Sequence, residues 1–133
     1  MRHVILSLIL MAGLTGGARA DETAMRSVIS DQIEAFLAED TERAFKHASP
    51  FIQRKFGTPE TFGDMVRNGY PMVWQPSDVT FLDLEVIDGT PFQSVRMRGP
   101  GGTSWIVDYE MIEVDGEWRI NGVRVREAPG LST

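Results

Sequence analysis

The sequence WIVDYEMIEVDGEWRINGVRV, residues 105–125, is the densest run of β-branched and aromatic residues after residue 20. The pair Asp115-Gly116 divides it, and an Asp-Gly pair between alternating hydrophobic residues is the strongest short-range signal for a β-hairpin. With this pair at the centre of a two-residue turn, Val114 lies opposite Glu117. We expect the inward-facing side of this hairpin to be the concave wall of a curved sheet. Its members are Trp105, Val107, Tyr109, Met111, Trp118 and Ile120.

A β-bulge is predicted in the second strand of this hairpin. After Ile120 the apolar residues fall out of phase, so Val123 would face outward in an unbroken ladder. One extra residue at Asn121-Gly122, where glycine tolerates a bulge, restores the phase. The resulting register places Val123 opposite Tyr109, Val125 opposite Val107 and Asp108 opposite Arg124.

An earlier hairpin is predicted from residues 79–87 and 92–98, which flank the turn sequence Asp88-Gly89-Thr90-Pro91. Pairing Ile87 with Phe92 brings apolar residues together on one face and acids opposite bases on the other. This register places Leu84 opposite Val95, Leu82 opposite Met97 and Asp83 opposite Arg96.

The part of the chain before these strands predicts helices. In residues 25–37, apolar side chains recur every three or four positions with charged residues between them, as in an amphipathic helix. Three N-cap signals follow, and each predicts the start of a further helix: Asp40, Ser49-Pro50 and Thr58-Pro59. Residues 70–77, YPMVWQPS, contain two prolines and two large aromatic residues, and predict a connection or a short edge strand.

The first twenty residues predict a signal peptide that is cleaved on export. Arg2 and His3 form a basic start, residues 4–14 an apolar core, and residues 18–20, Ala-Arg-Ala, a cleavage signal. This predicts a periplasmic protein that begins at Asp21, with one domain at residues 21–126 and a flexible tail at 127–133. The apolar core is shorter than the roughly 20 residues that span a bilayer.

Composition excludes several function classes. Cleavage would remove Arg2 and Arg19 and change the net charge from −6 to −8. Such a surface repels phosphate backbones and anionic lipids, so we expect neither nucleic-acid partners nor membrane partners after signal cleavage. The chain has no cysteine, which excludes disulfides, thiol chemistry and cysteine-based metal sites.

Few residues carry recognisable chemistry. We expect His47 to lie near the C-terminus of the second helix, where an imidazolium interacts favourably with the helix dipole. The predicted registers point the acids of the sheet outward: Asp83, Glu85, Asp108 and Glu110. We therefore predict no catalytic residue, no metal site and no cofactor.

Residues 44–74, AFKHASPFIQRKFGTPETFGDMVRNGYPMVW, resemble a bacterial exported family, domain of unknown function 4864, whose members carry a similar ASP…FG.PE.F..MV…Y pattern. The order of helices and bulged hairpins also resembles the nuclear transport factor 2-like superfamily. The resemblance implies an α+β fold in which N-terminal helices pack on a strongly curved antiparallel sheet of about four long strands. That superfamily includes isomerase-like enzymes and many binding or dimerising modules without activity.

The leading hypothesis is a non-catalytic module that binds a small apolar or aromatic ligand inside the cone. The residues predicted to contact it combine apolar area with a few polar groups: Tyr70, Trp74, Gln93, Trp105, Tyr109 and Trp118. One alternative is an isomerase, dehydratase or hydrolase that uses an inward carboxylate with Tyr109. Another is a protein–protein interaction module that forms a homodimer through the outer face of the sheet.

Overall fold

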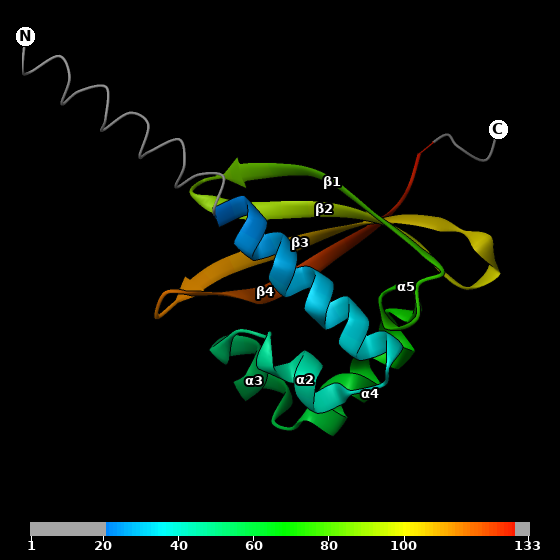
Figure 1. The fold of residues 1–133 in the computed structure, drawn as a ribbon. Helices are drawn as coiled ribbons and strands as arrows, with labels where there is room; N and C mark the ends of the chain where they lie inside the picture. Colours follow the sequence, from blue (N-terminus) through cyan, green and yellow to red (C-terminus); the bar gives the residue numbers. More distant parts are fainter. Residues whose placement is uncertain (1–20, 130–133) are drawn as a thin grey trace, which may run out of the picture.

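The computed structural model describes residues 21–129, in which helices come first and one four-stranded antiparallel sheet follows (Figure 1). The N-terminal helix occupies residues 21–37 and crosses one face of the sheet. The shorter helices are α2 (Thr41–Lys46), α3 (Pro50–Phe56), α4 (Pro59–Gly69) and α5 (Pro71–Trp74). The strands are β1 (Asp78–Ile87), β2 (Thr90–Arg98), β3 (Ser104–Val114) and β4 (Glu117–Glu127), with a 3-10 turn at Pro100–Gly102. The predicted α+β fold class is confirmed.

The predicted signal peptide, residues 1–20, and the last four residues of the predicted tail lie outside the described residues. β4 extends through Glu127, the first residue of that tail, and the backbone amide of Ala128 donates to the carbonyl of Ser104 at 2.9 Å. No helix within residues 21–129 has both the length and the apolarity needed to cross a membrane.

Each of the three predicted N-caps is confirmed. Backbone amides donate to the side chain of Asp40 at 3.2 Å, of Ser49 at 3.2 Å and of Thr58 at 3.1 Å. These bonds satisfy amides that have no acceptor within the helix, which is why α2, α3 and α4 begin where they do. Gly57 ends α3 with φ +82°, a conformation that glycine adopts without steric cost.

The prediction for residues 70–77 was wrong, because they contain the single-turn helix α5. Pro71 occupies the first helical position, where its missing amide hydrogen costs no hydrogen bond. Met72 and Val73 are buried by this turn, and the burial stabilises it despite the neighbouring prolines.

The strand order is β1-β2-β3-β4, and the β3–β4 register is the predicted one. Met111 pairs with Ile120 and Glu110 with Gly122, so Asn121 is the extra residue of a bulge. Gly122 is not among the glycines with positive φ, so the bulge does not depend on the conformational freedom of glycine.

The predicted register of the β1–β2 hairpin was wrong. Asp88 and Gly89 both have positive φ and form the two-residue turn alone, so Ile87 pairs with Thr90. A second irregularity lies between Phe81 and Leu84. The observed pairs are Leu84 with Gln93, Phe81 with Val95 and Thr80 with Arg96, so Asp83 does not lie opposite Arg96.

The inner face of the sheet is tightly packed at its centre. Val95, Val107 and Tyr109 have no exposed surface, and Ile29 of the N-terminal helix is equally buried. The buried hydrophobic residues of the helices and the sheet form one cluster, apart from Phe92 and Ile106. Open space between the helices and the sheet therefore has to be sought away from Tyr109.

Candidate functional site

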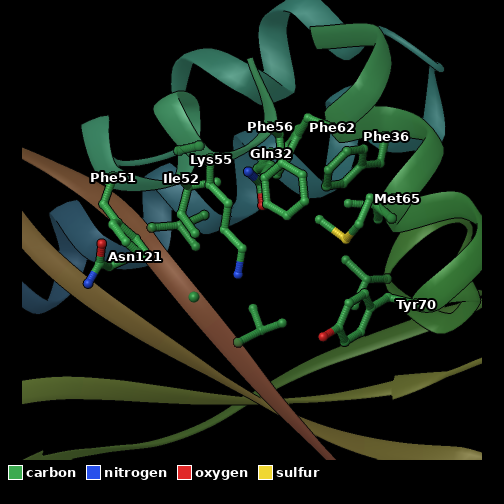
Figure 2. A pocket seen from close by; sticks show the side chains of 16 residues that line it. Gln32, Phe36, Phe51, Ile52, Lys55, Phe56, Phe62, Met65, Tyr70 and Asn121 are labelled. Carbon is green, nitrogen blue, oxygen red and sulfur yellow. The ribbon is translucent and has the colours of Figure 1, made fainter. Parts of the chain in front are cut away.

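A cavity of about 260 Å³ lies between the short helices and the middle of β4 (Figure 2). The helix α3 contributes Phe51, Ile52, Lys55 and Phe56, and α4 contributes Phe62, Met65 and Val66. The opposite wall consists of Ile120, Asn121, Gly122 and Val123 of β4. Tyr70 and Val73 close one side, and Gln32, Phe36 and Ala48 complete the lining.

The β4 bulge fixes the position of α3 beside this cavity. The Ser49 hydroxyl, which caps α3, donates to the side-chain oxygen of Asn121 at 2.7 Å, and the Asn121 amide donates to Glu110 at 2.9 Å. On either side of this link, the amide of Ile120 donates to the carbonyl of His47 at 2.7 Å, and the amide of Ser49 donates to the carbonyl of Ile120 at 2.8 Å. The start of α3 is therefore joined to the sheet at one point.

Helical spacing then selects which side chains of α3 face the cavity. Phe51 and Lys55 are four positions apart, as are Ile52 and Phe56, so the four share one side of a helix. Phe51 is 55% exposed, whereas Phe62 of the opposite helix is 6% exposed. The cavity thus has a closed apolar end near Phe62 and an open end near Phe51.

Two polar groups are available to a molecule in the cavity. The Lys55 side chain extends into the space from α3, and the Tyr70 hydroxyl points into it from the other side (Figure 2). Both polar side-chain atoms of Asn121 are already engaged, and the side-chain nitrogen of Gln32 donates to the carbonyl of Ala44 at 3.1 Å. The side-chain hydrogen-bond donors that remain free are therefore one ammonium group and one phenol.

Of the six residues predicted to bind ligand, Tyr70 lines this cavity and the other five lie outside it. Trp74 packs on Phe36 with ring centroids 5.6 Å apart. Trp105 and Trp118 are half-buried against the core.

Tyr109 and Gln93 are completely buried at the centre of the sheet. The Tyr109 hydroxyl has no hydrogen-bond partner within residues 21–129, and burial raises the pKa of this phenol above its usual range. The Gln93 amide donates to the carbonyl of Leu82 at 2.8 Å and accepts from Arg26 at 3.3 Å. Both residues support the packing of the sheet rather than line an open space.

The cavity residues that sequence reasoning missed are chiefly Phe51 and Lys55. Their spacing places them on the side of α3 that also carries Ile52 and Phe56, and this signal was present in the sequence. What the spacing could not show is that this side of α3 faces β4 across open space.

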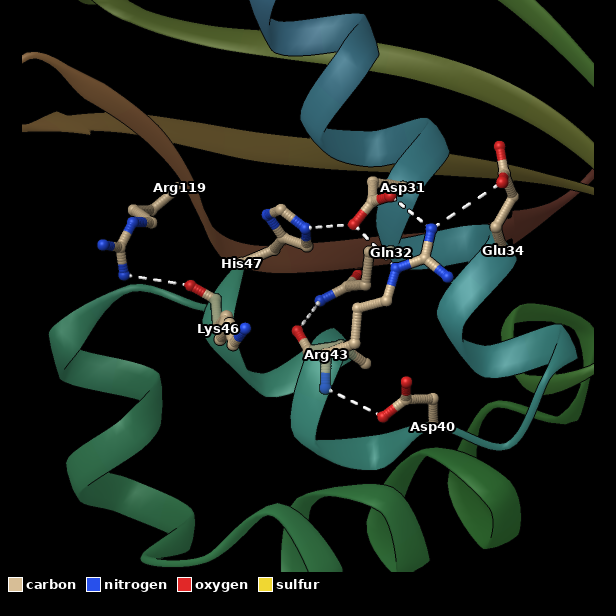
Figure 3. A network of polar contacts seen from close by, with 9 residues as sticks. Asp31, Gln32, Glu34, Asp40, Arg43, Lys46, His47 and Arg119 are labelled. Atoms are coloured by element: carbon tan, nitrogen blue, oxygen red, sulfur yellow. Dashed lines mark hydrogen bonds and ion pairs between the residues drawn. The ribbon is translucent and has the colours of Figure 1, made fainter.

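A polar cluster joins the N-terminal helix to α2 outside the cavity (Figure 3). The Asp31 carboxylate accepts from Arg43, with one bond of 3.1 Å, and lies 2.6 Å from Nε2 of His47. A hydrogen bond from Arg43, which has the larger effect, and one from His47 lower the pKa of Asp31 to about 2. His47 is the C-cap residue of α2, so its predicted position is confirmed.

The acids of the sheet do not enter the cavity, and Asp83 and Glu85 are exposed. Asp108 pairs across the strands with Arg124 as predicted, but its carboxylate accepts from Ser94 at 2.6 Å and from Arg126 at 3.2 Å. The Arg124 guanidinium instead lies 4.8 Å from the centroid of the Phe92 ring. Within residues 21–129, no group of three or more histidine or acidic side chains is placed to hold a metal ion.

The architecture and the cavity define an α+β domain with an apolar pocket between its short helices and the last strand. Residues 18–133 match the family described as "Domain of unknown function (DUF4864)", and the chain belongs to that family. No curated protein matches the sequence. Among solved structures, the chain is similar to one described as a hexachlorocyclohexane dehydrochlorinase (LinA) Type2, with 15% identity, a TM-score of 0.47, and coverage of 86% of this chain and 93% of that one.

Proposed function

We propose that this domain is a non-catalytic module that binds a small apolar or aromatic molecule in the cavity between α3, α4 and β4. The supporting observation is the lining, in which aromatic and aliphatic side chains predominate and two unengaged hydrogen-bond donors, Lys55 and Tyr70, are available. Ligand sites in proteins commonly combine such a lining with a few polar groups that fix orientation.

The size of the cavity limits the ligand. Its volume of about 260 Å³ lies just below the roughly 300–1,000 Å³ of drug-sized pockets. A molecule with one aromatic ring and a short chain is of suitable size, whereas a steroid-sized molecule would require α3 to move.

The chemistry of the lining favours binding over catalysis. The enzyme alternative requires an inward carboxylate beside Tyr109, but no aspartate or glutamate is among the described residues that line the cavity. Tyr109 itself lies in the packed centre of the sheet. A protein–protein role through the outer face of the sheet is a separate proposal, and sedimentation of the purified domain tests it.

We also propose that the mature protein acts in the periplasm. This rests on the basic start, the apolar core and the Ala-Arg-Ala signal in residues 1–20. The intact mass of protein purified from its native host should correspond to a chain that begins at Asp21. Full-length protein in the cytoplasm would contradict the proposal.

The binding proposal is tested by titrating the ¹⁵N-labelled protein with 4-phenylbutan-1-ol, a neutral molecule with one ring and a short chain. Amide signals of Ile52, Gly122 and Val123 should shift together and saturate. Ile52→Trp, which fills the cavity, should abolish these shifts. Val86→Trp is the matched control, because Val86 is 65% exposed and lies outside the cavity. Saturable shifts at the core but not around the cavity would contradict the proposed site.

A further inference from the structure

The formal charge in the described lining of the cavity is positive, although the protein as a whole is acidic. The chain has a net charge of −6, yet Lys55 is the one ionic side chain among the described residues that line the cavity. None of the ion pairs within residues 21–129 involves Lys55. A molecule in the cavity therefore meets a positive charge that forms no ion pair with a described carboxylate.

The position of Lys55 differs from that of the neighbouring base. Arg54 and Lys55 both lie in the last turn of α3, but Arg54 does not line the cavity. The Lys55 ammonium lies 5.6 Å from the centroid of the Phe56 ring, and the residue is exposed. In Figure 2 the Lys55 amine and the Tyr70 hydroxyl end on the same space from opposite sides.

An ordinary surface role for Lys55 would be to cover apolar surface with its aliphatic stem while its ammonium remains in water. That role does not explain why the Tyr70 hydroxyl points into the same space. An ammonium and a phenol facing one space are both able to donate to one oxygen-rich group, and bonds from a charged donor to a carboxylate are stronger than neutral ones.

We propose that the ligand is an amphipathic anion, a small apolar molecule with a carboxylate, and that Lys55 and Tyr70 bind the carboxylate while Phe56, Met65 and Val66 surround the apolar part. This inference rests on the proposed binding function and specifies the ligand class for the same cavity. Lys55 is then the residue that determines specificity.

The test compares 4-phenylbutyrate with 4-phenylbutan-1-ol, which share the ring and the chain and differ in the carboxylate. Both are titrated by calorimetry into the full mature chain at neutral pH and low salt. The carboxylate should bind roughly fivefold or more tightly than the alcohol, and added salt should reduce this ratio. Lys55→Gln should remove the preference by weakening the binding of the carboxylate, whereas Lys55→Arg should retain it. Arg54→Gln is the matched control, since it removes the same charge one residue away and should preserve the preference.

The possible outcomes separate this inference from the proposed function. If both probes bind equally, or if the alcohol binds more tightly, the domain is a binder and the anion inference is wrong. If Arg54→Gln lowers the preference as much as Lys55→Gln, the effect is one of overall charge and the role of Lys55 is refuted. If neither probe binds, the proposed function fails and the inference fails with it.

Discussion

The link between the α3 N-cap and the β4 bulge makes Ser49→Ala the sharpest test of the structure. Ser49 is 1% exposed; its oxygen accepts from the amide of Ile52 at 3.2 Å, and its hydroxyl donates to Asn121 at 2.7 Å. Losing the cap costs about 1 kcal/mol. Losing the second bond leaves the Asn121 oxygen without its donor and costs about 1 kcal/mol more. The substitution should therefore lower the free energy of unfolding by about 2 kcal/mol.

The matched control is Thr58→Ala, at the N-cap of α4. Thr58 accepts from the amide of Thr61 at 3.1 Å, but it is exposed and makes no bond to the sheet. Its loss should cost about 1 kcal/mol. Urea unfolding followed by tryptophan fluorescence measures both variants. Combining Ser49→Ala with Asn121→Ala should cost about 1 kcal/mol less than the sum of the single changes. Equal costs for Ser49→Ala and Thr58→Ala, or full additivity, would refute the proposed link.

Two further predictions concern other parts of the fold. The folded-state pKa of Asp31 lies below its unfolded value of 3.8, at about 2, so the stability from its contacts is present above about pH 4 and lost as the pH falls through 2. Because Asp31 is 39% exposed in its ion pairs, Asp31→Asn should cost at most about 1 kcal/mol at neutral pH. The difference in free energy of unfolding between Asp31→Asn and the unmodified protein should become smaller as the pH is lowered. A difference that stays constant with pH would argue against a contribution from the Asp31 carboxylate. Gly63→Ala should lower the free energy of unfolding by about 1–3 kcal/mol, because a Cβ there would collide with Cγ2 of Thr41. Adding Thr41→Ser, which removes that methyl group, should restore most of the lost stability, as measured by thermal unfolding.

The parts of the fold that could be predicted from sequence are those that local chemistry determines. The cap at Ser49 and the turn at Asp115-Gly116 each depend on a few neighbouring residues, and both were predicted correctly. The β1–β2 register failed because Asp88-Gly89-Thr90-Pro91 allows a two-residue or a four-residue turn, and the choice shifts each later pair.

The candidate site was harder to predict because no single element contains it. The aromatic row around Tyr109 has the composition of a pocket, but helix packing fills the space in front of it. Open space arises where Ser49 and Asn121 join α3 to β4 at one end and leave the rest of α3 apart from the strand. That separation depends on tertiary contacts between residues 72 positions apart in sequence.

The two irregular points of the sheet also influence how the domain meets neighbouring chains. A sheet edge with free backbone groups is a template for adding a strand from another molecule. On β1 the carbonyl of Leu82 accepts from the side chains of Arg26 and Gln93, and on β4 the backbone of Ile120 pairs with residues 47 and 49. β1 is thus irregular at Leu82 and Asp83, and the backbone of Ile120 in β4 is already paired outside the sheet. We expect both features to hinder the addition of a strand from another molecule along the full length of either edge.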